Sequence, residues 1–86
     1  MTHEIKLLEQ YAQAVKDGEK SFEIRYNDRG YQKGDRIKFT VVDKDGFKAY
    51  HELDDEEYEI TYVHSGFGMA DNYVALAIRQ VGGEQE

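Results

Sequence analysis

Residues 18–29 concentrate charged and amide side chains around one short run of alternating polar and apolar residues. The alternation places Glu23 and Arg25 next to each other on one face of an extended segment. An arginine offers a planar fork of donors that matches phosphate or carboxylate, and a nearby carboxylate can hold that fork in position. Lys20 and Arg29 add two more cations, so the stretch is a candidate for a small cationic ligand site. The side chains assigned to this site are Lys20, Glu23, Arg25, Asn27, Asp28 and Arg29.

Each of these side chains also has a purely structural interpretation. Lys20 can interact with the C-terminus of a preceding helix, and the glutamate–arginine pair can be an ion pair that only stabilises the strand. Asn27 and Asp28 are common in turns because their side chains bond to nearby backbone groups. Arg29 has no comparable role in a turn, which favours a ligand role for the arginines.

Tyrosine is abundant, with seven copies against four phenylalanines and no tryptophan. Tyr26 and Tyr31 flank the charged stretch, and bases stack on such rings with about 1–3 kcal/mol each in single-strand binding sites. In a small barrel, however, most tyrosines lie in the core with the hydroxyl at the surface. We include both tyrosines as candidate ligand-binding residues and keep the core alternative open.

The four residues Gly18, Lys20, Glu23 and Arg25 form the pattern G-x-K-x-x-E-x-R. This pattern resembles the signature of the ASCH superfamily, small PUA-like barrels associated with RNA. A longer set of matches is similar to a narrower branch, a family catalogued as a domain of unknown function (number 3850). The segments that carry this second resemblance are F-E-I-R-x-N-D-R over 22–29, Tyr31-Gln32-x-Gly34-Asp35, His3-x-Ile5-Lys6, and Gly66-Phe67-Gly68 with Tyr73-Val74-x-Leu76.

The resemblance implies a ligand cleft between a helix, the motif strand and neighbouring loops. It also implies an enzymatic alternative, because some ASCH relatives resemble amidohydrolases of acetylated cytidine. In those relatives the motif lysine acts with a threonine on the same strand and a distant glutamate. Here Lys20 is present, but Glu23 stands where that threonine would be, and the segment that carries the distant glutamate is missing.

The hydrophobic pattern by itself predicts a mainly β fold of the α+β class. Apolar residues at helical spacing indicate one early helix that ends at Gly18, and Asp43-Lys44-Asp45-Gly46 is typical of a tight hairpin turn. We expect a PUA-like pseudo-barrel of about six strands with one N-terminal helix, in a single domain over 1–81 with a flexible tail at 82–86. The predicted elements are a helix over 8–17 and strands over 4–7, 21–26, 36–42, 47–53, 58–64 and 73–80.

The composition favours a soluble protein. The 86 residues contain no cysteine, and no apolar run approaches the roughly 18 residues that cross a bilayer. The net charge is −7, yet residues 18–42 carry six basic and four acidic groups (+2), whereas 43–86 carry three and eleven (−8). The three histidines lack the short spacings of a zinc site. We expect a cytoplasmic monomer with no membrane segment, no metal and no cofactor.

The sequence leaves three functions open. The favoured one is a binding module for RNA or a nucleotide that uses Lys20, Arg25 and Arg29, with Glu23 orienting a guanidinium. The enzymatic alternative is an amidohydrolase acting on a modified nucleoside, and the lack of a recognisable nucleophile makes us favour binding over catalysis. The third is an adaptor whose acidic run, Asp54–Glu59, binds a basic protein partner.

Overall fold

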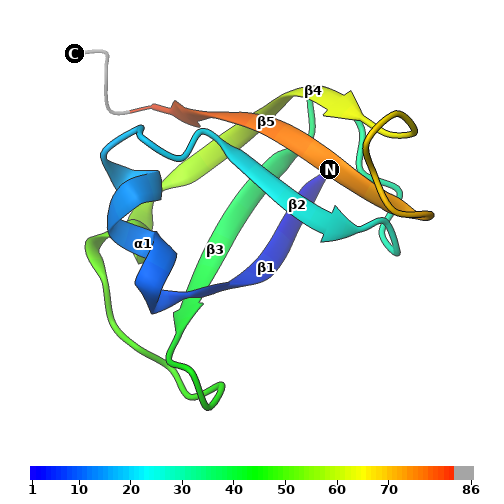
Figure 1. The fold of residues 1–86 in the computed structure, drawn as a ribbon. Helices are drawn as coiled ribbons and strands as arrows, with labels where there is room; N and C mark the ends of the chain where they lie inside the picture. The colour runs from blue at the N-terminus through cyan, green and yellow to red at the C-terminus, as the bar shows by residue number, and fades with distance from the viewer. Residues whose placement is uncertain (83–86) are drawn as a thin grey trace.

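The computed structural model describes residues 1–82, so the predicted tail lies, apart from Gly82, outside the described residues. Five strands, one α-helix and one 3-10 helix follow one another along this part of the chain (Figure 1). The prediction of a mainly β fold with one N-terminal helix is confirmed. The elements are β1 (Thr2–Leu8), α1 (Glu9–Lys16), β2 (Phe22–Tyr26), β3 (Arg36–Val42), η1 (Glu52–Asp55), β4 (Glu57–His64) and β5 (Tyr73–Val81).

The strands form one sheet in the order β1-β3-β4-β5-β2. The β1–β3 pair is parallel and the other pairs are antiparallel. The sheet curls into a half-barrel, which brings its two edge strands, β1 and β2, toward each other, and α1 covers one open end (Figure 1). The edge strands are therefore close in space although they are not paired through their backbones.

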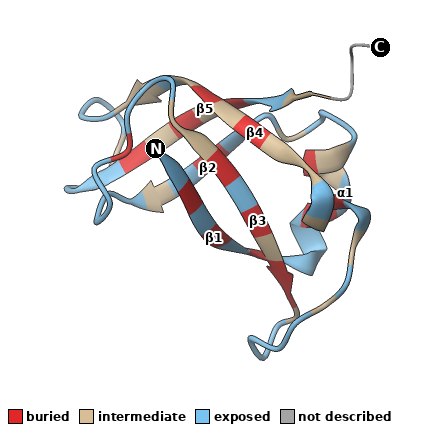
Figure 2. Cartoon of the chain, turned by 180° about the vertical axis from the view of Figure 1, so that it is seen from behind, coloured by how far each residue is buried: buried red, intermediate tan, exposed pale blue. Residues whose placement is uncertain are grey.

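Buried residues alternate with more exposed ones along the strands of the half-barrel (Figure 2). In β1 every second residue is buried, as the period of two along a strand requires, and β3 follows the same alternation up to Val41. The helix adds Ala12 and Val15 from its inner face. The largest fully buried side chains are Ile37, Leu53, Ile60, Leu76, Val15 and Val41.

Strand β2 alternates as predicted, but its polar face is the one that points inward. Glu23 is only 4% exposed, whereas Phe22, Ile24 and Tyr26 are 46%, 55% and 52% exposed. A buried carboxylate is costly unless it is paired and hydrogen-bonded. Its cationic partners, described below, make this orientation stable.

The predicted strand over 47–53 does not form. The turn before it does form, because the Asp43 carboxylate accepts hydrogen bonds from the backbone N–H groups of Asp45 and Phe47, both at 2.9 Å. Only one isolated bridge, between Val42 and Lys48, follows. The chain then enters η1, where a capping box replaces strand pairing.

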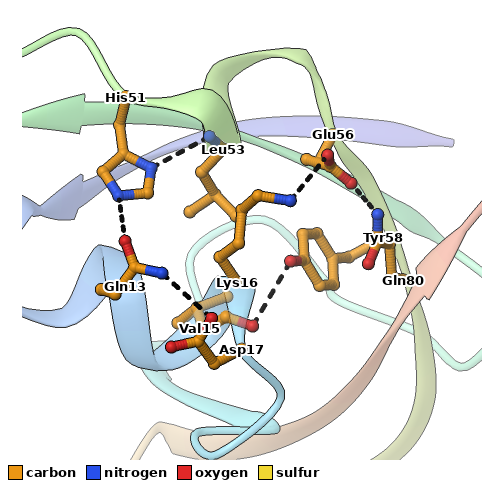
Figure 3. Close-up of polar contacts among 9 residues, drawn as sticks. All are labelled: Gln13, Val15, Lys16, Asp17, His51, Leu53, Glu56, Tyr58 and Gln80. Atoms are coloured by element: carbon orange, nitrogen blue, oxygen red, sulfur yellow. Dashed lines mark hydrogen bonds and ion pairs between the residues drawn. The ribbon is translucent and has the colours of Figure 1, made fainter.

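That capping box starts with His51, whose Nδ1 accepts a hydrogen bond from the backbone N–H of Leu53 at 3.0 Å (Figure 3). The other ring nitrogen, Nε2, lies 3.2 Å from the side-chain oxygen of Gln13 in α1. Because Nδ1 is an acceptor, Nε2 is the nitrogen that donates. The box thus fixes η1 against the helix and directs Leu53, which is fully buried, into the core.

Two further contacts hold α1 on the end of the sheet (Figure 3). The Tyr58 hydroxyl donates to the carbonyl of Val15 at 3.4 Å, and the Lys16 ammonium lies 3.3 Å from the Glu56 carboxylate. The helix therefore has a fixed position relative to β4. Within residues 1–82, no helix is long and apolar enough to cross a membrane.

Candidate functional site

The buried Glu23 carboxylate organises the charged side chains of the motif. One of its oxygens, Oε1, lies 2.5 Å from the Lys20 ammonium. The other, Oε2, accepts from Nη2 of Arg25 at 2.8 Å and from Nε at 3.2 Å. Both carboxylate oxygens are therefore engaged by a cation, and each cation is held by a charge-assisted hydrogen bond. Glu23 thus fixes the positions of Lys20 and Arg25.

The two arginines bridge the gap between the edge strands. Arg25 donates through Nη2 to the backbone carbonyl of Lys6, and Arg29 donates through Nη1 to the carbonyl of Glu4 at 2.9 Å. Both acceptors belong to β1, whereas Arg25 lies in β2 and Arg29 in the turn after it. In a closed barrel, backbone hydrogen bonds would join β1 to β2. In this protein the two guanidinium groups connect these strands instead.

A first cleft, of about 410 Å³, opens on the helix side of this bridge. Three cations, Lys6, Lys20 and Arg25, and one anion, Glu23, line it. Its apolar wall consists of Leu7, Leu8, Tyr11, Phe22 and Ile24. The Lys20 ammonium lies 4.7 Å from the ring centre of Phe22 and 5.4 Å from that of Tyr11, so charge and aromatic surface meet in one cleft.

A second cleft, of about 460 Å³, opens on the other side of Arg25. Arg29 contributes its charge to this cleft and not to the first one. The three predicted cations thus do not share one concavity, and Arg25 is the one that borders both clefts. The lining of the second cleft is Glu4, Ile5, Lys6, Arg25, Tyr26, Asp28, Arg29, Tyr31 and Thr40.

The remaining predicted site residues occupy different environments. The side-chain oxygen of Asn27 accepts from the backbone N–H of Tyr31 at 3.0 Å, as expected for a turn residue. Tyr26 is half-exposed and packs edge-on against Tyr73, with ring centres 5.5 Å apart. Tyr31 is 5% exposed, and its ring centre lies 4.8 Å from that of His3. Burial raises the pKa of the Tyr31 hydroxyl, although Arg29 and Arg25 partly oppose this effect.

His3 forms a buried polar pair below the second cleft. Its Nε2 lies 2.8 Å from a carboxylate oxygen of Asp35, and the terminal ammonium of Met1 lies 3.5 Å from the other oxygen. The hydrogen bond from His3 lowers the pKa of Asp35 below its ordinary value. His3 therefore joins β1 to the start of β3. Within residues 1–82, no cluster of three side chains is suited to hold a metal ion.

Sequence reasoning missed several cleft residues, and Lys6 is the most important of them. Lys6 borders both clefts, yet it lies 14 residues before Lys20 in the chain. Its alternation with Ile5 and Leu7 indicated an outward-facing cation, which was the one available signal. Tyr11 and Phe22 were equally hidden, because an aromatic residue at helical or strand spacing usually belongs to a core.

Comparisons with known proteins agree with this fold. The chain matches the family model described as "Domain of unknown function (DUF3850)" over residues 2–78. It is also similar to the crystal structure of hypothetical protein PH0355, with a TM-score of 0.61 and 20% sequence identity over 94% of this chain and 100% of that one. At this identity the likeness shows a shared fold alone. No curated protein is significantly similar to the chain. On the strength of the family match over residues 2–78, the chain belongs to the DUF3850 family, a domain of unknown function.

Proposed function

We propose that the protein binds a nucleotide, free or at the end of a single-stranded RNA, in the first cleft. The observation that carries this proposal is the pair Lys20 and Arg25, which the buried Glu23 holds at the mouth of a cleft with an aromatic wall. The resemblance of this motif to the ASCH signature supports the same role. The phosphate would lie against the cations and the base against Tyr11 or Phe22.

The cations have donors left for a ligand. Lys20 has three N–H donors and uses two, toward Glu23 and the carbonyl of Phe22. Arg25 has five and uses Nε and Nη2, so among residues 1–82 its Nη1 group has no hydrogen-bond partner. These donors are fixed before a ligand arrives, which lowers the entropic cost of binding a phosphate.

The size and charge of the cleft favour a single nucleotide over a duplex. Its volume of about 410 Å³ lies within the range of small-molecule sites. Two or three phosphate contacts on a single strand correspond to a log–log salt slope of roughly −1.5 to −2. The net charge of −7 disfavours a long polyanion.

Neither of the other two functions gains support from a specific contact. The Lys20 ammonium donates to two oxygens, an arrangement suited to holding a charge rather than to accepting a proton. The acidic run is largely paired within the molecule, since Asp54 contacts Lys48, Glu56 contacts Lys16, Glu57 contacts Arg36 and Glu59 contacts Arg79. A basic partner would have to compete with these internal cations.

The test is an amide chemical-shift titration of the full chain with the four nucleoside monophosphates and a short single-stranded RNA. We expect shifts in α1, β1 and β2 around the first cleft. In Lys20→Gln, affinity should fall at least tenfold, because one phosphate contact is lost. Lys33→Gln is the matched control: it removes an exposed lysine that lines neither cleft, and it should bind like the wild type.

Inorganic phosphate and acetylated cytidine complete the experiment. Phosphate alone should bind more weakly than a nucleotide, because it cannot use the aromatic wall. If Lys20→Gln and Lys33→Gln lost the same amount of nucleotide affinity, only the overall charge of the protein would matter, which would contradict the proposal. Turnover of acetylated cytidine would instead support the amidohydrolase.

A further inference from the structure

A second surface, separate from the core, carries exposed aromatic residues on three neighbouring strands. We call it the outer sheet face and define it as eight outward residues of β2, β5 and β4, bounded along β5 and β4 by the ion pair of Arg79 and Glu59. In Figure 1, β2 and β5 lie side by side in front, and no described element covers them. The residues of the outer sheet face are Phe22, Ile24, Tyr26, Tyr62, His64, Tyr73, Ala75 and Ala77.

The strand register arranges these residues in rows across the sheet. Phe22, Ala77 and Tyr62 form one row, and Ile24, Ala75 and His64 form the next. Tyr26 and Tyr73 complete a third row, with their rings edge-on at 5.5 Å. The two alanines on β5 therefore form a shallow trough between two ridges of larger side chains.

The five large apolar residues of this face are exposed by 41% to 61% of their surface: Phe22, Ile24, Tyr26, Tyr62 and Tyr73. With 150–250 Å² per aromatic side chain, they leave about 500 Å² of largely apolar surface in water. A patch of this size is at the upper end for a monomeric protein and commonly marks an interaction site. Isolated exposed apolar residues need no such explanation, but contiguous rows do.

We propose that the outer sheet face is the interface of a symmetric homodimer. A two-fold axis pairs a patch with itself, and a ridge-and-trough surface can pair with a copy of itself by placing a ridge of one copy in the trough of the other. Two copies would bury about 1,000 Å² in total, which is the lower bound for a specific interface. This proposal replaces the monomer that we expected from the sequence.

The charge distribution favours a second copy over a charged partner. Aspartate, glutamate, lysine and arginine together make up 34% of the chain, yet none of them is among the eight residues of this face. The next row across β5 and β4 consists of Arg79 and Glu59, which pair with each other at 2.7 Å. A polyanion or a highly charged protein would have to compete with this internal ion pair. The copies repel each other through their net charge of −7, so the dimer is weak and salt, by screening this repulsion, strengthens it.

The test is sedimentation analysis of the full chain from about 10 µM to 1 mM, at low and high salt. We expect a concentration-dependent dimer whose population rises with salt. Tyr62→Ser should weaken the dimer at least about tenfold, as truncation of a central interface tyrosine usually does. Tyr62 lines neither cleft, although Phe22 and Ile24 of this face also line the first one. At a low protein concentration, where wild type and variant are both monomeric, nucleotide binding should be the same in the two proteins.

Tyr50→Ser is the matched control, because Tyr50 is 89% exposed and lies outside the outer sheet face. It should dimerise like the wild type, and thermal unfolding should show that both variants fold. The dimer proposal would be wrong if the wild type remained monomeric at the highest concentration. It would also be wrong if both variants lost the same amount of dimer affinity. If short single-stranded RNA perturbs Tyr62 of a monomeric protein, the face is a base-stacking platform instead.

Discussion

At the scale of single residues, Glu23 combines a full negative charge with almost no contact with solvent. Removing one member of a buried ion pair commonly costs 3–5 kcal/mol, because the remaining charges lose their compensation. Here Lys20 and Arg25 keep part of their contact with water, which reduces that cost. Glu23→Gln should therefore lower the free energy of unfolding by about 3 kcal/mol, measured by urea denaturation.

The control for this change is Glu19→Gln, which removes an exposed carboxylate four residues away. Its effect should stay within about 0.5 kcal/mol, as for most surface substitutions. If the free energy of unfolding fell by a similar amount in both variants, the buried carboxylate would not hold the two cations. The proposal that the phosphate donors are fixed in position would then be wrong.

Tyr58 gives a prediction for alkaline pH. Burial raises its pKa from 10.0 to about 12, so between these values the folded protein holds a proton that the unfolded chain releases. Its contribution to stability is complete below about pH 10 and falls as pH rises toward 12, by at most about 1.4 kcal/mol per pH unit. Urea denaturation at increasing pH should show this slope.

In Tyr58→Phe the slope should become shallower, although stability at neutral pH falls by about 1 kcal/mol through loss of the hydrogen bond to Val15. Tyr50→Phe, at an exposed position, should keep the wild-type slope. An unchanged slope in Tyr58→Phe would locate the alkaline transition elsewhere.

At the scale of elements, the meeting of β1 and β2 distinguishes this sheet from a closed barrel. Unpaired strand edges invite pairing with other chains, and here Arg25 and Arg29 bind the β1 carbonyls that face the gap. Replacing both arginines by glutamine should open the gap and cost about 3–6 kcal/mol, since two hydrogen bonds to charged groups are lost and each contributes about 1.5–3 kcal/mol. Native-state hydrogen exchange should then be faster in β1 and β2 than in β3 and β4.

An arginine at the surface offers the comparison for this prediction. Arg79 pairs with Glu59 at 2.7 Å, but its side chain is 67% exposed. Arg79→Gln should leave exchange in β1 unchanged, because exposed ion pairs contribute little. If the double variant also exchanges like the wild type, the guanidinium groups do not hold the edges together.

At the scale of the whole molecule, the charge of −7 gives the two proposed interactions opposite salt dependences. Salt screens the attraction between a phosphate and the cationic cleft, and it also screens the repulsion between two acidic copies. Raising the salt concentration should weaken nucleotide binding while it strengthens the dimer. Titration calorimetry and sedimentation in the same buffers would measure both, and a common sign would contradict one of the proposals.

Much of the fold could be predicted because it depends on local patterns. The alternation in β3 and β5 and the helical spacing before Gly18 each involve residues within one element, and Gly18 has the positive φ of 81° that a left-handed C-cap requires. The strand predicted over 47–53 was wrong for a reason that is not visible in its pattern. There the His51 capping box and the burial of Leu53 under α1 prevailed over the alternation.

For the candidate site, the sequence by itself determined that Glu23 and Arg25 share a face of one strand and that Lys20 lies within their reach, because these spacings are short. Only the tertiary structure decided that this face points inward, since the burial of a carboxylate depends on cations that must be in place around it. It also decided that Lys6 joins the site and that Arg29 borders a different cleft. The sheet curls so that β1 approaches β2, and this curl results from the packing of all five strands. It therefore cannot be predicted from the pattern of any single segment.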